Sequence, residues 1–390
     1  MVKKNTNYFF KNTKFLLLIL CILILSVFIY LSYQTTESFN NINHKYYRCN
    51  IKKIGLITGE IFKENNIIKD NNDWTIYVPC GYNHVEKELL TIKCNEDNNN
   101  FGNKYIFGIN GCDSIVSKNK IWESLVNCFG RIEASKYMPE SYVLHNTNDM
   151  KKFKKNFNSK NIYILKKNIQ RKEGLKLTNS LNTIMNSLLD NYKVVQTYLT
   201  NLYLVNKRKV NLRIYLLIVI KNGYKMFYIS NLGKCIYTRK EYNDDNYDFE
   251  SNITSYNLDM TVYEKNPRNF IELFKYVDEN SNLNDKSNSK ILSQNIYNLM
   301  KKISICLNNN IFQSSNIKKC TCFQIFGADV IFDNNLHPYL LELNKGPDMI
   351  PRDDIDKSMK KNVQEDMFKI VGILPESDTN SFYEIHKSKL

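Results

Sequence analysis

Two apolar segments near the C-terminus, residues 323–332 and 338–344, limit the possible folds of this chain more than any other part of its sequence. The first reads Phe-Gln-Ile-Phe-Gly-Ala-Asp-Val-Ile-Phe and the second reads Pro-Tyr-Leu-Leu-Glu-Leu-Asn. Two such segments on either side of a short Asn-rich break are typical of a β-hairpin. Apolar residues flank the acidic residues in both segments, so we expect the hairpin to lie within a buried sheet.

Three polar residues share one face of this predicted hairpin. Side chains alternate along a strand, so Glu342 and Asn344 project to the same side. With the turn centred between residues 335 and 336, Asp329 lies directly opposite Glu342 and points the same way. Two carboxylates and a carboxamide are oxygen donors that suit Mg2+, which completes its shell with waters and substrate phosphates. The sequence therefore predicts a magnesium–nucleotide site; the alternative is an ordinary hairpin with solvent-facing acids, which a buried sheet disfavours.

The net charge of the chain is +15, from 54 Lys and Arg residues against 39 Asp and Glu residues. A surface with this excess attracts anionic partners such as acidic peptides, nucleic acid or anionic lipid. The alternative is compositional, because a bias toward Asn, Lys, Ile and Tyr raises the charge without any selected partner. With 390 residues, of which 43% are hydrophobic, the chain is long enough for two or three domains with a sizeable core.

The ten cysteines do not follow a zinc-binding pattern. The closest pair, Cys320 and Cys322, has no matching second pair, and the five His residues are scattered. We expect free buried thiols. The alternative, which requires an oxidising compartment, is disulfide formation among Cys49, Cys80, Cys94, Cys112 and Cys128.

Residues 15–31 form an uncharged apolar run in which Ser26 is the one polar residue. Extended to residue 33, the run reaches the length of a membrane-spanning helix. We therefore predict a basic N-terminal flank over residues 1–14 and a single-pass transmembrane anchor over residues 15–33. The lysines before the run favour a cytoplasmic N-terminus with the body on the far side. A cleaved signal peptide is the alternative, but the run is long and lacks a small-x-small cleavage site.

Beyond a polar tether over residues 34–50, short apolar runs alternate with Asn- and Asp-rich breaks, which is typical of strands and loops. We expect an N-terminal α/β domain over residues 51–150. Its predicted elements are strands at 54–57, 74–78, 105–109 and 139–144 and a helix at 121–129.

A second domain is expected over residues 151–375, followed by a polar tail over residues 376–390. Residues 241–290 are rich in Asn, Asp, Ser and Lys, and we expect a mobile insertion there. The predicted elements of this domain are a basic helix at 149–157, strands at 162–165, 194–199, 212–220 and 225–229, a helix at 291–307, the hairpin and a helix that ends near 370.

Several motifs, taken in order and spacing, resemble those of the tubulin–tyrosine ligase-like enzymes, which are ATP-grasp amino-acid ligases. The resemblance covers roughly residues 101–350. Its motifs are Tyr163-Ile-Leu-Lys166, Val194-Val-Gln-Thr-Tyr-Leu199, Lys209-Val-Asn-Leu-Arg213, the hairpin at 326–344 and, more weakly, Ser117–Trp122 before Met138-Pro139. The implied fold class is α+β of the ATP-grasp type, with the nucleotide held between two α+β subdomains within residues 151–375, preceded by a single transmembrane helix.

The resemblance also implies a role for each motif. Residues expected to bind ATP are Lys118, Lys166, Gln196, Thr197, Tyr198, Leu199, Lys209 and Asn211. The lysines would contact phosphates, with Lys120 as the alternative to Lys118. Arg213 is the expected catalytic residue, since its fork suits a carboxylate or an acyl-phosphate. The expected metal ligands are Asp329, Glu342 and Asn344.

The implied cofactors are ATP and Mg2+, and the implied reaction is a two-step ligation. A substrate carboxylate attacks the γ-phosphate to give an acyl-phosphate, and an amine then displaces phosphate to form an amide. The expected partners are an acidic protein substrate, possibly a tubulin tail, and a free amino acid, most readily glutamate. Nucleic acid is not an expected partner, and the sequence gives no indication of oligomeric state.

The chain departs from the family pattern at several positions. Lys172 stands where the first Gly of a phosphate loop is usual, and Asn211 replaces an Asp. Ile236 stands where an arginine is usual, although Arg239 is close by; Thr254-Ser-Tyr256 keeps part of a Thr-Asn-Tyr element, and Lys345 replaces a small residue. These departures leave two alternatives open: a degenerate member that binds ATP or a partner without ligating, and a basic membrane-tethered scaffold.

Overall fold

The computed structural model describes residues 22–27, 44–49, 53–94, 104–169, 174–243, 247–254, 259–280 and 287–390. The chain divides into two compact units, Met1–His44 and Lys45–Leu390. All the strands, and the helices labelled from α2 onward, lie in the second unit.

The transmembrane anchor predicted over residues 15–33 is wrong. No helix in the described part of the chain is both long and apolar enough to cross a membrane. Of the predicted anchor, the structure describes residues 22–27, as a helix. The rest of the anchor and the basic flank lie outside the described residues, and the predicted single-pass membrane localisation is withdrawn.

A ten-stranded mixed sheet forms the centre of the second unit. Its strand order is β14 (Phe382–Lys389), β11 (Tyr224–Tyr237), β10 (Arg208–Lys221), β12 (Thr321–Phe332), β4 (Tyr105–Phe107), β3 (Ile76–Tyr77), β1 (Lys45–Tyr47) and β2 (Ile68–Lys69). In addition, β13 (Pro338–Asn344) pairs with β12, and β9 (Leu204–Val205) pairs with β10. The sheet therefore holds the first strands and the last strand of the globular part at its two opposite edges.

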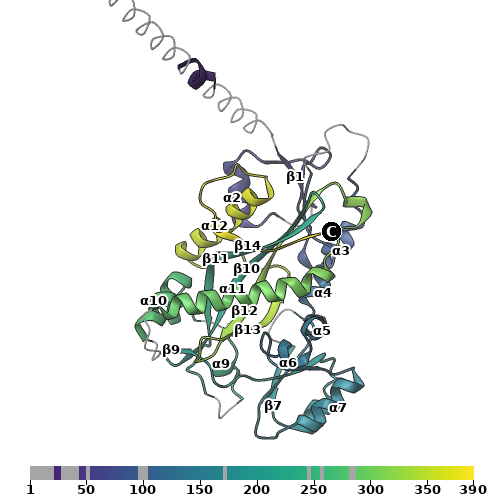
Figure 1. The fold of residues 1–390 in the computed structure, drawn as a ribbon, viewed down its shortest axis with the longest axis vertical. Helices are drawn as coiled ribbons and strands as arrows, with labels where there is room; N and C mark the ends of the chain where they lie inside the picture. The colour runs from purple at the N-terminus through teal and green to yellow at the C-terminus, as the bar shows by residue number, and fades with distance from the viewer. Residues whose placement is uncertain are drawn as a thin grey trace, which may run out of the picture. The chain divides into compact units, whose positions relative to one another are not determined.

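Strand β10 accounts for the helices on both faces of this sheet, because it is apolar at every position from Ile214 to Ile220. Leu212, Ile214 and Leu216 face one core, whereas Tyr215 and Leu217 face another. The first core is covered by α5 (Lys118–Phe129), α10 (Phe270–Asn280) and α11 (Asn288–Leu307). The second is covered by α2 (Leu56–Glu64) and α12 (Asp354–Val371), which lie side by side in Figure 1.

A smaller antiparallel sheet has the strand order β5 (Ser141–Val143), β8 (Val194–Thr197), β6 (Tyr163–Lys166) and β7 (Leu175–Thr178). It packs with α7 (Thr147–Asn156) and α8 (Leu181–Asn186) around a core that includes Phe153 and Leu165. Helix α7 begins earlier than predicted because the Asn146 side chain accepts from the backbone N–H groups of Asn148 and Asp149. Two sheets of this mixed α/β kind are consistent with the predicted ATP-grasp arrangement.

The remaining elements are short. They are α3 (Val85–Leu89), α4 (Cys112–Val116), α6 (Arg131–Ala134), α9 (Phe249–Asn252) and 3-10 turns at Tyr82–His84, Met260–Glu264, Asn308–Asn310 and Ser315–Ile317. Residues 241–290, expected to be a mobile insertion, contain α9, the turn at 260–264 and α10. The apolar residues of α10 pack on the main core, and this packing explains the order in a polar stretch.

Two predicted elements differ from the structure for identifiable reasons. The strand expected at 54–57 is the start of α2, because Ile57, Ile61 and Phe62 recur at helical spacing and are buried together. The tail expected at 376–390 contains β14, which pairs with β11 and buries Phe382 and Ile385. Strand β14 was missed because its two buried residues, Phe382 and Ile385, are three positions apart and do not follow the alternation of a strand.

Among the described residues, three disulfides replace the expected free thiols. They join Cys49 to Cys80, Cys94 to Cys320 and Cys128 to Cys306, with Cα–Cα distances of 5.6, 6.3 and 5.7 Å. Cys112, Cys235 and Cys322 are buried free thiols, as expected. Two of the bridges join residues 226 and 178 positions apart, so only the folded chain brings these partners together.

Candidate active site

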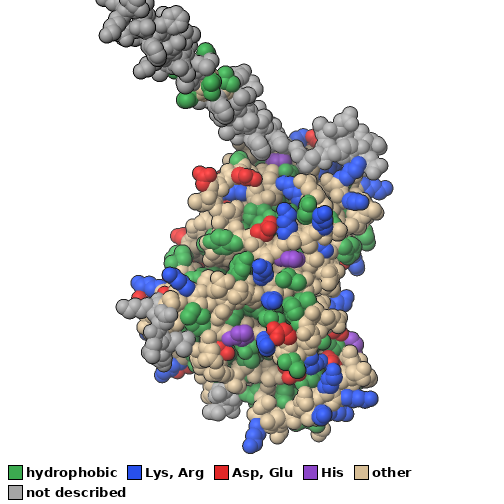
Figure 2. All heavy atoms as spheres, in the orientation of Figure 1, with side chains coloured by type: hydrophobic (Ala, Val, Ile, Leu, Met, Phe, Trp, Pro, Cys, Tyr) green, Lys and Arg blue, Asp and Glu red, His purple; other side chains and the backbone are tan. Residues whose placement is uncertain are grey.

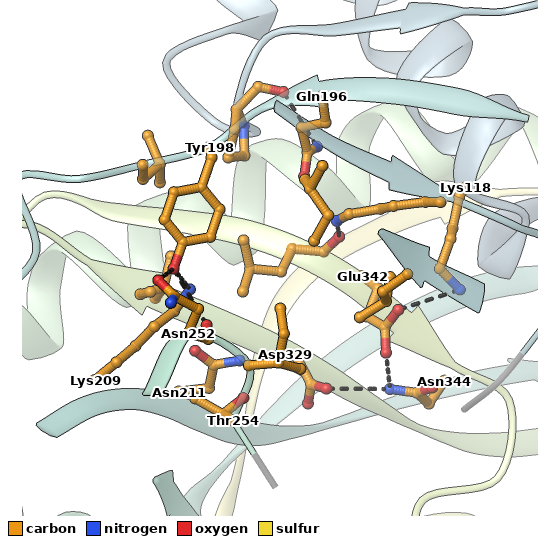
Figure 3. A pocket seen from close by; sticks show the side chains of 18 of the residues that line it. Lys118, Gln196, Tyr198, Lys209, Asn211, Asn252, Thr254, Asp329, Glu342 and Asn344 are labelled. Atoms are coloured by element: carbon orange, nitrogen blue, oxygen red, sulfur yellow. Dashed lines mark hydrogen bonds and ion pairs between the residues drawn. The ribbon is translucent and has the colours of Figure 1, made fainter. Parts of the chain in front are cut away.

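A cavity of about 1160 Å3 is lined by residues of both sheets. Every site residue predicted from the sequence lines it, and Figure 3 shows most of these side chains converging on one space. They are Lys118, Lys166, Gln196, Thr197, Tyr198, Leu199, Lys209, Asn211, Arg213, Asp329, Glu342 and Asn344. The structure therefore brings together motifs that are spread over more than half of the sequence.

Two strand lysines contribute positive charge to this cavity. Lys166 is the last residue of β6, and its Nζ donates to the Leu341 carbonyl at 3.3 Å. Lys209 is on β10, where its Nζ donates to the Tyr198 hydroxyl at 3.2 Å and lies 4.5 Å from the centre of that ring. Both side chains are buried. Neither lysine forms an ion pair with any residue that the structure describes, so an anionic ligand can meet both charges.

Burial changes the protonation of both lysines. Desolvation lowers the pKa of Lys166 to about 8. Desolvation, reinforced by the charge of Lys166, lowers the pKa of Lys209 to about 7. A bound polyanion would stabilise the charged forms and raise both values again. Lys118, at the start of α5, is instead paired, with its Nζ 3.2 Å from Glu342 Oε2.

The predicted register of the hairpin is confirmed. Asp329 on β12 pairs directly with Glu342 on β13, and Asn344 lies two residues beyond Glu342. The Asn344 amide nitrogen lies 3.4 Å from Asp329 Oδ2 and 3.3 Å from Glu342 Oε1, so these three side chains converge. Turning that amide over would direct its oxygen to the same point. This donor set fits a hard divalent cation such as Mg2+.

The carboxylates of Asp329 and Glu342 have different basic neighbours. Arg213 holds Asp329 through two bonds, Nε to Oδ1 at 2.6 Å and a terminal nitrogen to Oδ2 at 3.2 Å. Burial nevertheless raises the pKa of Asp329. Glu342 is also desolvated, but Lys118 and Lys166 lower its pKa. Arg213 therefore lies directly beside the residues that would hold a divalent cation.

Apolar side chains line the cavity near β8, which carries part of the segment expected to bind ATP. They are Ile164, Leu175, Ile331 and Leu341. The Gln196 side chain is used within the protein, because its Nε2 donates to the Pro139 carbonyl at 3.2 Å and to Ser141 Oγ at 2.8 Å. The contact with ATP that is expected of Gln196 is therefore limited to its Oε1 atom.

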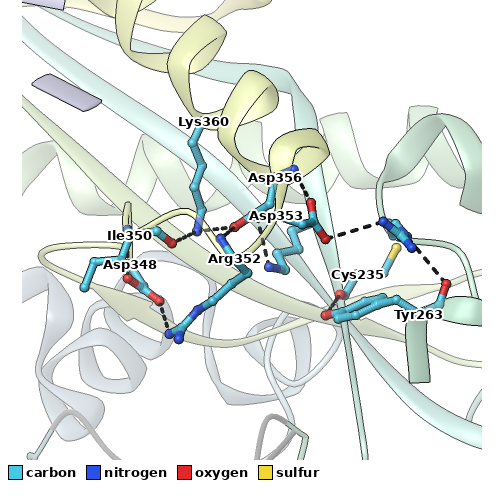
Figure 4. Close-up of polar contacts among 10 residues, drawn as sticks. Cys235, Tyr263, Asp348, Ile350, Arg352, Asp353, Asp356 and Lys360 are labelled. Carbon is cyan, nitrogen blue, oxygen red and sulfur yellow. Dashed lines mark hydrogen bonds and ion pairs between the residues drawn. The ribbon is translucent and has the colours of Figure 1, made fainter. Parts of the chain in front are cut away.

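Several cavity residues were not predicted as site residues. Asn252, Ile253 and Thr254 come from the end of α9, in the segment expected to be mobile. Asp348 and Arg352 follow β13, and an Arg352 terminal nitrogen lies 2.8 Å from Asp348 Oδ2, as Figure 4 shows. Asp348 and Arg352 could have been predicted from the charged residues that follow the expected metal ligands in the sequence.

Next to that pair, a buried network anchors the start of α12. Asp356 accepts from Lys234 and Lys360, each at 2.9 Å, and Lys360 also donates to the Ile350 carbonyl at 2.8 Å (Figure 4). Asp356 and Lys360 are both buried. This network fixes the loop that carries Asp348 and Arg352.

The departures from the family pattern have different outcomes. Ile236 pairs with Asn211 across β10 and β11, and Arg239 bonds Glu250 at 3.0 Å; neither Ile236 nor Arg239 lines the cavity. Asn211 does line it, and its Oδ1 is buried without a hydrogen-bond partner in the described structure. Lys345 is buried in an ion pair with Asp113. Lys172 and Tyr256 lie outside the described residues.

Comparison with known proteins gives a consistent result. The model of the Tubulin-tyrosine ligase family matches residues 72–381. The chain is 27% identical over 286 residues to a probable beta-tubulin polyglutamylase of Tetrahymena thermophila, covering 67% of this chain and 23% of that protein. It is 22% identical over 351 residues to tubulin monoglutamylase TTLL4 of Mus musculus, covering 83% and 28%. It is 23% identical over 368 residues to tubulin glycylase 3F of Tetrahymena thermophila, covering 84% and 37%. The chain thus spans less than half of the length of each relative.

Proposed function

This chain belongs to the tubulin-tyrosine ligase family, and from that premise we propose that it is an ATP-dependent ligase that joins an amino acid to a protein. The observation that carries the proposal is the convergence, in one cavity, of the donor set Asp329, Glu342 and Asn344 with Lys166 and Lys209. A divalent cation and a polyphosphate would each find complementary charge there.

Each group in the cavity has a distinct task in this proposal. Asp329, Glu342 and Asn344 would hold Mg2+, and Lys166 and Lys209 would meet the phosphates. Bound ATP would supply the phosphoryl group that activates a carboxylate for coupling to an amine. The protein's own contribution is positioning and charge neutralisation, which is sufficient for phosphoryl transfer without a protein nucleophile.

We propose glutamate as the amino acid and an acidic protein tail, such as that of tubulin, as the acceptor. Relatives named as a polyglutamylase and a monoglutamylase support glutamate. The net charge of +15 supports an acidic acceptor. Lysines gather on the exposed face of α7, in the lower part of Figure 2: Lys151, Lys152, Lys154 and Lys155. Such a face attracts an acidic tail over a screening length of about 8–10 Å.

The direct test is incorporation of labelled amino acid into tubulin by the full chain with ATP and Mg2+. We expect glutamate to be incorporated, with no incorporation when Mg2+ is removed by a chelator. The same assay with glycine and tyrosine defines the choice of amino acid. If no amino acid is incorporated into tubulin or into any other acidic acceptor, the proposed ligase activity is refuted.

A degenerate member of the family is the second candidate. Two observations favour it. Ile236 takes the position of the usual arginine and does not line the cavity, and Arg213 is bound to Asp329. This candidate predicts Mg-ATP binding, measured as thermal stabilisation, without turnover in the presence of any acceptor. The scaffold alternative depended on a membrane tether and is not carried further.

A further inference from the structure

A second cavity, of about 700 Å3, adjoins the first and shares Gly346 and Asp348 with it. Its walls come from α2, from the loop that follows β3, and from the loop between β13 and α12. Most of its lining is apolar: Ile57, Val78, Phe107, Ile325, Met349, Ile350 and Met367. The proposed mechanism makes no use of this space.

Two hydrogen-bond donors in this apolar lining lack acceptors. Gln364, on α12, is 3% exposed; its Oε1 accepts from Thr58 Oγ1 at 2.5 Å, whereas its Nε2 has no partner in the described parts of the chain. Arg48 Nε is likewise buried without a described partner. A buried donor without an acceptor is costly, so the observation points to a ligand that accepts hydrogen bonds.

The position of Arg48 is fixed by its neighbours. The disulfide between Cys49 and Cys80 ties the residue after Arg48 to the cavity wall, and an Arg48 terminal nitrogen lies 3.5 Å from the Cys80 carbonyl. Desolvation lowers the pKa of Arg48, although the nearby charge of Glu88 offsets part of this effect. A guanidinium held in this way offers a carboxylate two parallel bonds.

We propose that the second cavity binds a carboxylate at the end of a short aliphatic chain, with Arg48 and Gln364 as its donors. The apolar lining suits the methylene groups, and the shared wall at Gly346 and Asp348 directs the other end of the ligand toward the first cavity. This inference rests on the proposed function, for which a glutamate side chain is such a ligand. That side chain can come from the free amino acid or from the acceptor protein.

The test is a calorimetric titration of the full chain with L-glutamate, L-glutamine or a glutamate-rich peptide, alongside Mg-ADP. We expect glutamate to bind at least about tenfold more tightly than glutamine, because the amide cannot meet the charge of Arg48. Arg48→Met and Gln364→Leu should each weaken glutamate binding, by about tenfold for Arg48→Met, and leave Mg-ADP binding unchanged. The matched control is Lys361→Met. Lys361, on α12, forms an ion pair with Glu64, on α2, outside both cavities.

The outcomes separate the possibilities. If free glutamate binds and both variants weaken its binding, the cavity is assigned to the amino acid. If only the peptide binds, the cavity is assigned to the acceptor. Equal binding of glutamate and glutamine, native binding by both variants, or no binding of glutamate or peptide overturns the inference. Mg-ADP binding and ligation are measured independently, so their loss would count against the proposed function instead. If Arg48→Met fails to fold, Gln364→Leu decides the result.

Discussion

The two cavities share a wall at Gly346 and Asp348, but their polar groups are arranged in opposite ways. In the first cavity, charged side chains stand on neighbouring strands and contact one another, as Asp329 and Arg213 do. In the second, Arg48 and Gln364 stand in an apolar lining with donors that no described residue meets. Neighbouring strands put functional residues at regular spacings, whereas the second cavity is assembled from segments that only the fold brings together.

The largest effect is expected from removing a charge in the first cavity, where the charged side chains contact one another. Glu342→Gln keeps the shape of the side chain but removes one of two carboxylates in the metal set. We expect ligation to fall by about 1000-fold, the upper range for losing one group that stabilises transition-state charge. The change in kcat measures this effect, and the midpoint of thermal unfolding reports whether the fold is retained.

The control for that experiment is Glu365→Gln, which removes a half-buried carboxylate that pairs with Lys361 on α12. Because this pair lies outside both cavities, activity should stay near the native level. Equal activities for Glu342→Gln and Glu365→Gln would contradict the assignment of the metal set.

The shared wall offers a second test. A methyl group at Gly346 would meet the Tyr82 ring, so Gly346→Ala forces that ring to move. We expect a loss of about 1–3 kcal/mol in the free energy of unfolding, the usual cost of overpacking. Adding Tyr82→Leu should recover most of that loss, and chemical denaturation of the single and double variants measures the coupling. Additive effects would show that Tyr82 and Gly346 do not form a common wall.

A smaller change is expected from Lys209→Met, which removes a buried charge that no described acid compensates. Mg-ADP should bind about tenfold more weakly, because one phosphate contact is lost. The ligand-free protein should become more stable, since an unpaired buried ammonium is costly. Thermal unfolding with and without Mg-ADP measures both effects. Lys275→Met, on the exposed side of α10, is the control and should change neither.

Prediction from the sequence succeeded for the alternation of side chains along strands, and failed for a short apolar run and for contacts between distant segments. The hairpin register and the positions of Lys166 and Lys209 followed from alternation along strands, together with the family resemblance. The start of α2 was missed because a short apolar run does not distinguish strand from helix. The pairing of Cys94 with Cys320 and the presence of Arg48 and Gln364 in one cavity depend on tertiary structure that no local spacing encodes.

The smallest effect, and the finest test of the first cavity, is the dependence of stability and binding on pH. The pKa values of Lys166 and Lys209, about 8 and about 7, lie below the 10.5 of an ordinary lysine. The unfolded chain therefore binds more protons than the folded chain between about pH 7 and 10, so the stability of the ligand-free protein rises with pH through that window.

Nucleotide binding should change in the opposite direction, because phosphates prefer the charged lysines. We expect the affinity for Mg-ADP to fall by less than tenfold per pH unit above about pH 7. In Lys209→Met the fall should begin only near the pKa of Lys166, and an unchanged onset would show that Lys209 does not titrate in contact with the nucleotide.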